Sequence, residues 1–206
     1  MTIPGRAALK SEILKPGMRI GLYGGSFDPP HIAHAHVART AMKRLGLDRV
    51  WWLISPGNPF KAHQPAAIDE RIAIINALVP DPRMVPSAIE AGLPSSRTAD
   101  VIAWMQMRYP GVDFVWIMGA DGFAQLHRWH NWQDIAARVP ICVVSRPGST
   151  LKALCSPAAR RLSHARVPET QARALVSCVP GWTYLTEPLH PHSSRALRAS
   201  VAAKED

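Results

Sequence analysis

The sequence predicts an α/β protein built on a doubly wound parallel sheet, and three observations support this fold class. Short apolar runs typical of buried strands alternate along the chain with longer stretches that have helical periodicity. The strongest run, Val112 to Met118, is almost continuously apolar, as strands of parallel sheets are. Gly and Pro residues fall between the runs and mark the connections. In such folds the crossovers are right-handed, and ligands bind beyond the carboxyl ends of the strands.

The individual elements follow from the same patterns. The expected strands cover residues 19–23, 50–54, 84–85, 112–118, 141–144 and 182–185. The expected helices cover residues 32–45, 68–78, 98–108, 123–126, 132–137 and 194–203. Gly46 stops the first helix, because glycine readily adopts the left-handed conformation of a helix C-cap. Trp51 and Trp52 are neighbours in a strand and therefore point to opposite faces of the sheet. Residues 147–180 hold Pro/Ser turns and one Arg/Ala-rich stretch.

Length and composition indicate one globular domain. The chain has 206 residues, of which 47% are hydrophobic and 19% charged, enough for one well-buried core. We expect residues 1–17 to form a flexible leader and residues 18–206 a single domain. No apolar run is long enough to span a bilayer or to act as a secretory signal, so a cytoplasmic protein without a membrane partner is expected. The cysteines lack disulfide or zinc spacing, which indicates a reducing compartment, with Cys142 buried in an apolar run.

The chain is basic, with 24 Lys and Arg against 15 Asp and Glu and a formal net charge of +9. A basic surface attracts polyanions, which makes nucleic acid the first partner to consider. The positive charges are scattered, however, and neither a Lys/Arg block nor an aromatic-basic repeat of a nucleic-acid module is present. A small phosphorylated substrate explains the charge equally well, and no nucleic-acid partner is predicted.

The first expected strand runs into the segment GGSFDPPHIAH, residues 24–34. Gly24 and Gly25 allow close approach of a ligand to the backbone and conformations closed to other residues. His31 and His34 are three residues apart at a helix start, so both lie on one face, together with free helix N–H groups. Imidazole donors, free amides and the positive end of a helix dipole form a phosphate site. A proline-rich turn with incidental histidines is the simpler alternative, but the agreement of glycines, prolines and the strand-to-helix junction favours the phosphate site.

This segment resembles the GG[ST]FDPxHxGH signature of the nucleotidyltransferase superfamily, whose fold is Rossmann-like. Five further segments resemble the nicotinate-nucleotide adenylyltransferases within it: SPGNPFK (55–61), SRTAD (96–100), WIMGAD (116–121) with the tryptophan segment RWHNW (128–132), RPG (146–148) and HSSRALR (192–198). Together they cover about Arg19 to Arg198 in the family's order. One such motif is moderately specific, whereas six in order are strongly so.

The resemblance implies that the chain transfers AMP from ATP to nicotinate mononucleotide, giving nicotinate adenine dinucleotide and pyrophosphate in NAD biosynthesis. The phosphate of the mononucleotide attacks the α-phosphorus of ATP in line, so catalysis is positioning and charge stabilisation, and Mg²⁺ arrives with ATP. The residues implied as catalytic are His31, His34, Lys61 and Arg198. Those implied in ATP binding are Gly24, Gly25, Ser26, Phe27, His31, His34, Gly119, Asp121, Ser193, Ser194 and Arg198. Those implied in binding nicotinate mononucleotide are Asn58, Lys61, Thr98, Asp100 and Trp129, with the pyridine ring stacked on Trp129. No carboxylate cluster with metal spacing is visible, so no protein metal site is expected.

Two positions depart from the family pattern. Ala33 replaces the usual glycine of HxGH and adds a methyl group where the nucleotide normally packs, and Arg195 stands where threonine is usual. Three alternatives remain open: a pantetheine-phosphate adenylyltransferase, a preference for the amide substrate nicotinamide mononucleotide, and a binding or sensing module that reuses the fold without catalysis. A homo-oligomer is also left open.

Overall fold

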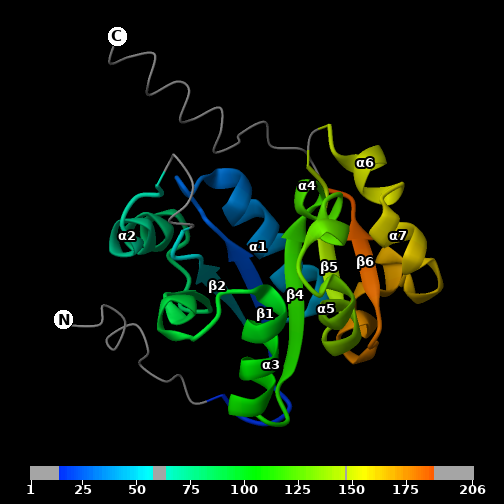
Figure 1. The fold of residues 1–206 in the computed structure, drawn as a ribbon, viewed down its shortest axis with the longest axis horizontal. Helices are drawn as coiled ribbons and strands as arrows, with labels where there is room; N and C mark the ends of the chain where they lie inside the picture. The colour runs from blue at the N-terminus through cyan, green and yellow to red at the C-terminus, as the bar shows by residue number, and fades with distance from the viewer. Residues whose placement is uncertain (1–13, 58–63, 147, 188–206) are drawn as a thin grey trace.

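The computed structural model describes residues 14–57, 64–146 and 148–187. Within these ranges a six-stranded sheet has the order β3-β2-β1-β4-β5-β6, and every neighbouring pair is parallel (Figure 1). The strands are β1 (Arg19–Gly25), β2 (Arg49–Ile54), β3 (Met84–Ser87), β4 (Asp113–Gly119), β5 (Ile141–Val144) and β6 (Trp182–Leu185). The predicted doubly wound parallel sheet is therefore confirmed. The strand order reverses direction between β1 and β4, which is where such sheets bind ligands.

Helices of two kinds connect these strands. The α-helices are α1 (Ile32–Leu45), α2 (Ile68–Leu78), α3 (Thr98–Arg108), α4 (Ala120–Phe123), α5 (Trp132–Arg138), α6 (Thr150–Leu154) and α7 (Pro157–Arg161). The 3-10 helices are η1 (Ile89–Gly92), η2 (Leu126–Arg128), η3 (Ser163–Ala165) and η4 (Glu169–Ser177). Gly46 caps α1 in the left-handed conformation, with φ 68° and ψ 44°, as the sequence predicts. The Pro/Ser-rich stretch after β5 is thus largely made of short helical turns.

The two faces of the sheet carry separate hydrophobic cores. One core packs the strands against α3, α5 and their neighbours, and the other packs them against α1, α2 and η4 (Figure 1). Trp51 belongs to the first core and Trp52 to the second, which confirms their opposite directions. Cys142 is fully buried in the second core and is a free thiol, as expected.

Most element boundaries agree with the prediction to within one or two residues, and two of the differences bear on the site. β1 continues through both glycines, because Gly24 and Gly25 still pair with Leu53 and Ile54 of β2. The helical segment expected at residues 123–126 instead begins at Ala120, directly at the end of β4. The chain therefore leaves β1 two residues later than expected, and it enters α4 directly from β4 without an intervening turn.

Other expectations concern the ends of the chain. Part of the expected leader lies against the domain, because Leu14 packs on the first core and the Gly17 N–H donates to the Gly111 carbonyl at 2.7 Å. The expected helix at residues 194–203 lies outside the described residues. Within the described ranges, every helix is too short or too polar to cross a membrane.

Candidate active site

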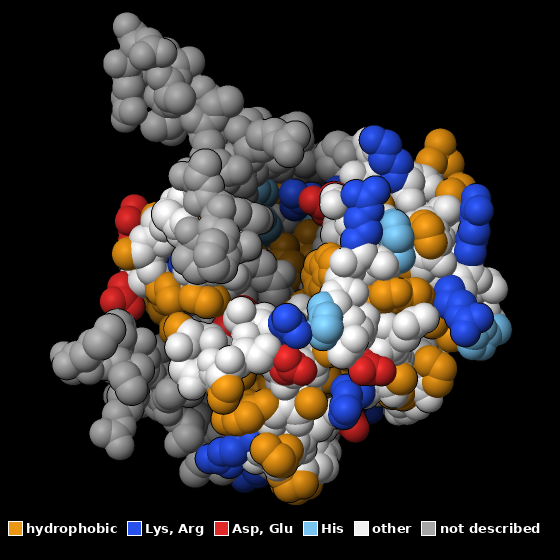
Figure 2. All heavy atoms as spheres, viewed as in Figure 1, with side chains coloured by type: hydrophobic (Ala, Val, Ile, Leu, Met, Phe, Trp, Pro, Cys, Tyr) orange, Lys and Arg blue, Asp and Glu red, His pale blue; other side chains and the backbone are white. Residues whose placement is uncertain are grey.

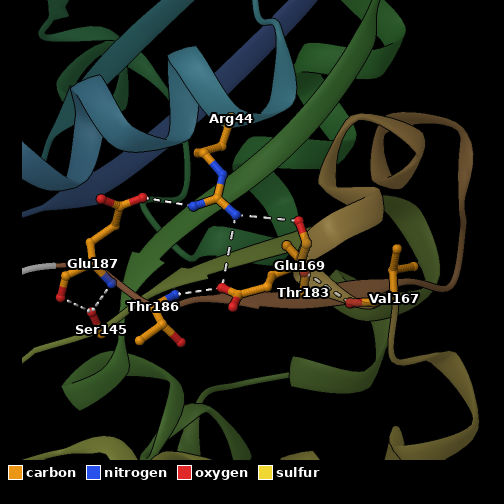
Figure 3. A network of polar contacts seen from close by, with 7 residues as sticks. All are labelled: Arg44, Ser145, Val167, Glu169, Thr183, Thr186 and Glu187. Atoms are coloured by element: carbon orange, nitrogen blue, oxygen red, sulfur yellow. Dashed lines mark hydrogen bonds and ion pairs between the residues drawn. The ribbon is translucent and has the colours of Figure 1, made fainter.

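The carboxyl ends of β1 and β4 lie side by side, since Tyr23 of β1 is in register with Ile117 of β4. β1 therefore delivers the GGSFDPPHIAH segment to the same edge of the sheet at which β4 delivers Gly119 and Asp121. In Figure 2 a hollow opens on the face shown, and histidine, basic and acidic side chains line it beside hydrophobic ones. The candidate site is built from the loops that leave this edge.

Gly24 lies so close to the Trp116 ring that there is no room for a side chain at this position. A Cβ atom on Gly24 would overlap the Trp116 ring, whose Cζ2 would lie only 2.8 Å away. Neither Gly24 nor Gly25 has a positive φ, so the prediction that they adopt conformations closed to other residues is wrong. The left-handed residue is Phe27, with φ 46°. Its ring is buried against Tyr23, Trp52 and His34 at centroid distances of 5.1, 5.1 and 5.2 Å, and this packing holds the turn in place.

His31 and His34 lie together, as predicted. Their rings are stacked, with centroids 3.7 Å apart and planes 25° apart. The His31 backbone N–H donates to Nδ1 of His34 at 3.3 Å. Burial lowers the pKa of His34 well below its usual value, and the nearby His31 and Arg146 lower it further. The ring of His34 is therefore neutral at pH 7, and because Nδ1 accepts a hydrogen bond, its proton sits on Nε2, where it can be donated to a ligand.

An ion pair lies just beyond the ends of two neighbouring strands. Arg146 follows β5, and its Nε lies 3.9 Å from Oδ1 of Asp121, which follows β4. The stem of Arg146 lies across Gly119, where a Cβ atom would be 3.2 Å from its Cγ and 2.6 Å from the Asp121 carboxylate. The Arg146 side chain is only 13% exposed, whereas that of Asp121 is 57% exposed. Asp121 is thus presented to solvent at the site edge with a cation behind it.

A buried arginine joins two loops of the site. Arg71 of α2 is 1% exposed, and its Nη1 donates to the Ser26 carbonyl at 2.6 Å and to the Ser55 carbonyl at 2.9 Å. Burial lowers the pKa of Arg71, while the Asp28 carboxylate raises it. Asp28 in turn accepts a hydrogen bond from the Ala66 N–H at 3.2 Å. The turn after β1 and the loop after β2 are therefore fixed relative to each other by one guanidinium.

The tryptophan segment lies on the other face of the sheet. Trp129 packs half-buried on the first core, and its ring meets the ring of Trp116 edge-on, with centroids 6.3 Å apart and planes at 84°. The helix start SRTAD faces the same segment, because Nη1 of Arg97 lies 3.1 Å from Nε2 of His130. Thr98 is half-buried at the start of α3, and Oδ2 of Asp100 accepts from the Ser95 hydroxyl at 2.6 Å. The edge of the sheet thus has histidines on one face and tryptophans on the other.

A groove of about 660 Å³ opens beside Asp121. It runs between α4 with η2 and α6 with α7, and its lining includes Arg128 and Lys152. Arg128 and Trp129 are neighbours in the sequence, but Arg128 lines this groove, whereas Trp129 packs on the first core.

Several site residues implied by the sequence cannot be placed. Asn58, Lys61, Ser193, Ser194 and Arg198 lie outside the described residues. The structure brings together Gly24, Gly25, Ser26, Phe27, His31 and His34 in one turn, and Gly119 and Asp121 at the neighbouring strand end. Among the residues the structure describes, no group of three His, Cys, Asp or Glu side chains could hold a metal ion.

Comparison with known proteins agrees with this architecture. The cytidylyltransferase-like family model matches residues 22–199. The chain is 49% identical over 184 residues to a probable nicotinate-nucleotide adenylyltransferase of Cereibacter sphaeroides, covering 89% of this chain and 97% of that protein. A probable nicotinate-nucleotide adenylyltransferase of Ruegeria pomeroyi is also 49% identical, over 90% of this chain and 88% of its own length. The chain belongs to the nicotinate-nucleotide adenylyltransferase family.

Solved structures of nicotinate-nucleotide adenylyltransferases share the fold at low sequence identity. The Plasmodium falciparum nicotinic acid mononucleotide adenylyltransferase complexed with NaAD aligns with a TM-score of 0.66 and 16% identity, covering 88% of this chain and 83% of that one. The same enzyme complexed with APC aligns with a TM-score of 0.65 and 15% identity over the same shares. At this identity the likeness supports the nucleotidyltransferase fold.

Sequence reasoning missed two arginines of the candidate site. Arg146 was noted only as part of an RPG turn, and Arg71 was not singled out at all. Neither charge stands out in the sequence, since Arg71 follows Asp69 and Glu70 in a helix and Arg146 lies in a turn, and only the fold buries them beside the loops that leave the strands. A usable signal for Arg71 was its position in a helix whose other inward residues are apolar.

Proposed function

We propose that this nicotinate-nucleotide adenylyltransferase joins AMP from ATP to nicotinate mononucleotide through the turn that carries His31 and His34. The observation that carries the proposal is the stacked histidine pair at the switch point of the sheet, with a neutral His34 whose Nε2 carries a proton. Such a donor stabilises charge on the phosphate oxygens without having to lose its own proton.

In the proposed reaction, a phosphate oxygen of nicotinate mononucleotide forms a bond to the α-phosphorus of ATP. The bond from that phosphorus to the bridging oxygen breaks at the same time, and pyrophosphate leaves with its electron pair. The nucleophile arrives ionised, so no protein base is needed. His31 and His34 donate to the triphosphate, and Arg146, held 3.9 Å from Asp121, adds a fixed positive charge to the same edge. Asp121 accepts from a ribose hydroxyl.

The pyridine end is proposed to lie on the tryptophan face. Trp129 is half-buried, so one part of its ring is fixed on the core and the remainder is free to stack on an aromatic base. Thr98, Asp100 and the first amides of α3 would meet the ring substituent, since no side chain caps this helix start. Asn58, Lys61, Ser193, Ser194 and Arg198 are proposed to complete the phosphate contacts. Mg²⁺ would enter bound to ATP and supply additional charge neutralisation, because the described part of the chain offers no group of three His, Cys, Asp or Glu side chains that could hold it.

Release of pyrophosphate from ATP tests the proposal directly. The purified protein is mixed with ATP and, separately, with nicotinate mononucleotide, nicotinamide mononucleotide or phosphopantetheine. We expect the highest kcat/KM with nicotinate mononucleotide and a dinucleotide product in stoichiometric amount with pyrophosphate. Turnover only with phosphopantetheine, or binding of ATP without turnover of any acceptor, would contradict the proposal.

A further inference from the structure

Arg97 connects the two elements that are proposed to hold the pyridine ring. It directly precedes α3, with an extended backbone of φ −71° and ψ 131°, and its side chain does not cap the helix. Instead the guanidinium reaches across to the tryptophan segment, where Nη1 lies 3.1 Å from Nε2 of His130. Because an arginine only donates, Nε2 of His130 is the acceptor and the proton of this imidazole sits on Nδ1. The guanidinium of Arg97 therefore lies against the residue that directly follows Trp129.

The charge of Arg97 remains available to a ligand. In the described part of the chain, the one side-chain contact of its guanidinium is the imidazole of His130, while a guanidinium presents five N–H groups. The nearest carboxylate along the chain, Asp100, accepts the Ser95 hydroxyl at 2.6 Å, and that hydroxyl oxygen accepts the Arg97 backbone N–H at 3.2 Å. Arg97 and His130 are both exposed, so the guanidinium can turn toward a bound molecule without losing a buried contact.

We propose that Arg97 is a specificity-determining residue that selects the acid form of the mononucleotide over the amide form. The inference rests on the proposed function, because it needs a pyridine ring stacked on Trp129. A carboxylate on that ring would lie between the Arg97 guanidinium and the free amides at the start of α3, where a cation and the helix dipole both favour negative charge. A carboxamide at the same place is uncharged and gains neither interaction.

The expected size follows from the exposure of the guanidinium. Exposed ion pairs are weak, whereas charge-assisted bonds that are partly shielded from water by a stacked ring are stronger. We therefore expect Arg97 to contribute about fivefold to tenfold to the ratio of kcat/KM for nicotinate mononucleotide over nicotinamide mononucleotide. Since salt screens an exposed charge within about 10 Å at 0.1 M, the contribution should shrink as ionic strength rises.

The experiment measures kcat/KM for both mononucleotides at a fixed ATP concentration in the full chain. Arg97→Gln should lower the acid-to-amide ratio by about fivefold to tenfold, almost entirely through the acid substrate, and Arg97→Lys should restore part of it. His130→Ala removes the contact but keeps the cation, so it should leave the ratio within about twofold of the wild type. Arg108→Gln is the matched control, because it removes the same charge from the other end of α3, about 16 Å away at 1.5 Å per residue, and it should leave the ratio unchanged.

The outcomes separate this inference from the proposed function. A wild-type chain that turns over neither mononucleotide would overturn the proposed function itself. A wild type that is active on nicotinate mononucleotide, together with an unchanged ratio in Arg97→Gln, would overturn only the role of Arg97. An equal loss of kcat/KM for both substrates in Arg97→Gln would show that the contact is structural and would overturn the role of Arg97. The same conclusion would follow if His130→Ala lost as much selectivity as Arg97→Gln.

Discussion

Replacing Glu90 by glutamine should stabilise the protein at alkaline pH and have much less effect at acid pH. Glu90 lies in η1, just after β3, and is only 7% exposed. Burial raises the pKa of its carboxyl from 4.5 to about 7. In the unfolded chain the same carboxyl titrates near its usual value. Between the two pKa values the folded state therefore binds the proton that the unfolded state releases, and the stability of the wild type falls as pH rises through this window.

The magnitude follows from the same two values. A shift from 4.5 to about 7 corresponds to about 3 kcal/mol once both states are ionised, at roughly 1.4 kcal/mol per pKa unit. Glutamine does not ionise, so the variant avoids this cost, although its buried amide carries a cost of its own. Comparing the variant with the wild type at pH 5 and again at pH 8.5 cancels the amide cost, and about 2–3 kcal/mol should remain. For a chain of this size that difference is about 5–10 °C in Tm.

The assay is thermal or urea unfolding of both proteins without ligand, at constant ionic strength. The stability difference between Glu90→Gln and the wild type should grow in favour of the variant from pH 5 to pH 8.5. Glu70→Gln is a suitable control, since Glu70 is exposed in the first turn of α2, and its difference should stay constant across this range. A pH-independent difference for Glu90→Gln would show that its carboxyl is solvated or neutralised in the folded protein, and the reasoning from burial would fail.

Three further substitutions test the site and its supports. His34→Ala should lower kcat by roughly 10²–10⁴ with the fold intact, because it removes the Nε2 donor, and near-normal turnover would take His34 out of the mechanism. Arg71→Met should cost about 3–5 kcal/mol in urea unfolding, since it removes the buried guanidinium that donates to the carbonyls of Ser26 and Ser55, and a loss below about 1 kcal/mol would mean that the loops do not depend on it. Ala33→Gly should lower stability by up to about 1 kcal/mol and leave the KM for ATP equal or lower, whereas a large rise in that KM would show that the methyl group favours ATP binding.

The fold was predictable because its signals are local. Each strand is an apolar run, the longer helices have clear stops such as Gly46, and alternation of the two element types specifies a parallel sheet. The histidine pair was predictable for the same reason, since three-residue spacing at a helix start puts both rings on one face. The boundaries that failed depend on pairing between distant segments. β1 extends to Gly25 only because β2 offers partners as far as Ile54.

The supports of the site could not be predicted from the sequence in this way. Arg71 is buried rather than solvated because its guanidinium donates to the carbonyls of Ser26 and Ser55. These two carbonyls are 29 residues apart in the chain, so their positions depend on the whole fold. The charge of Arg146 matters only because β5 pairs with β4 and brings it to Asp121. Single charged residues carry no periodicity, so their burial is a property of the assembled sheet rather than of the local pattern.

The first glycine of the family motif has a packing role that the sequence did not indicate. The sequence predicts that Gly24 lets the backbone approach a ligand, and the structure adds a second role, because Gly24 makes room for the Trp116 ring, which in turn meets Trp129 edge-on. The end of β1 is thereby in contact, through one tryptophan, with the ring that is proposed to stack on the pyridine. Any side chain at residue 24 would displace Trp116 and with it the support of Trp129. A Gly24 substitution should therefore weaken nicotinate mononucleotide binding as well as ATP binding, whereas a glycine needed only for close approach of ATP would affect ATP alone.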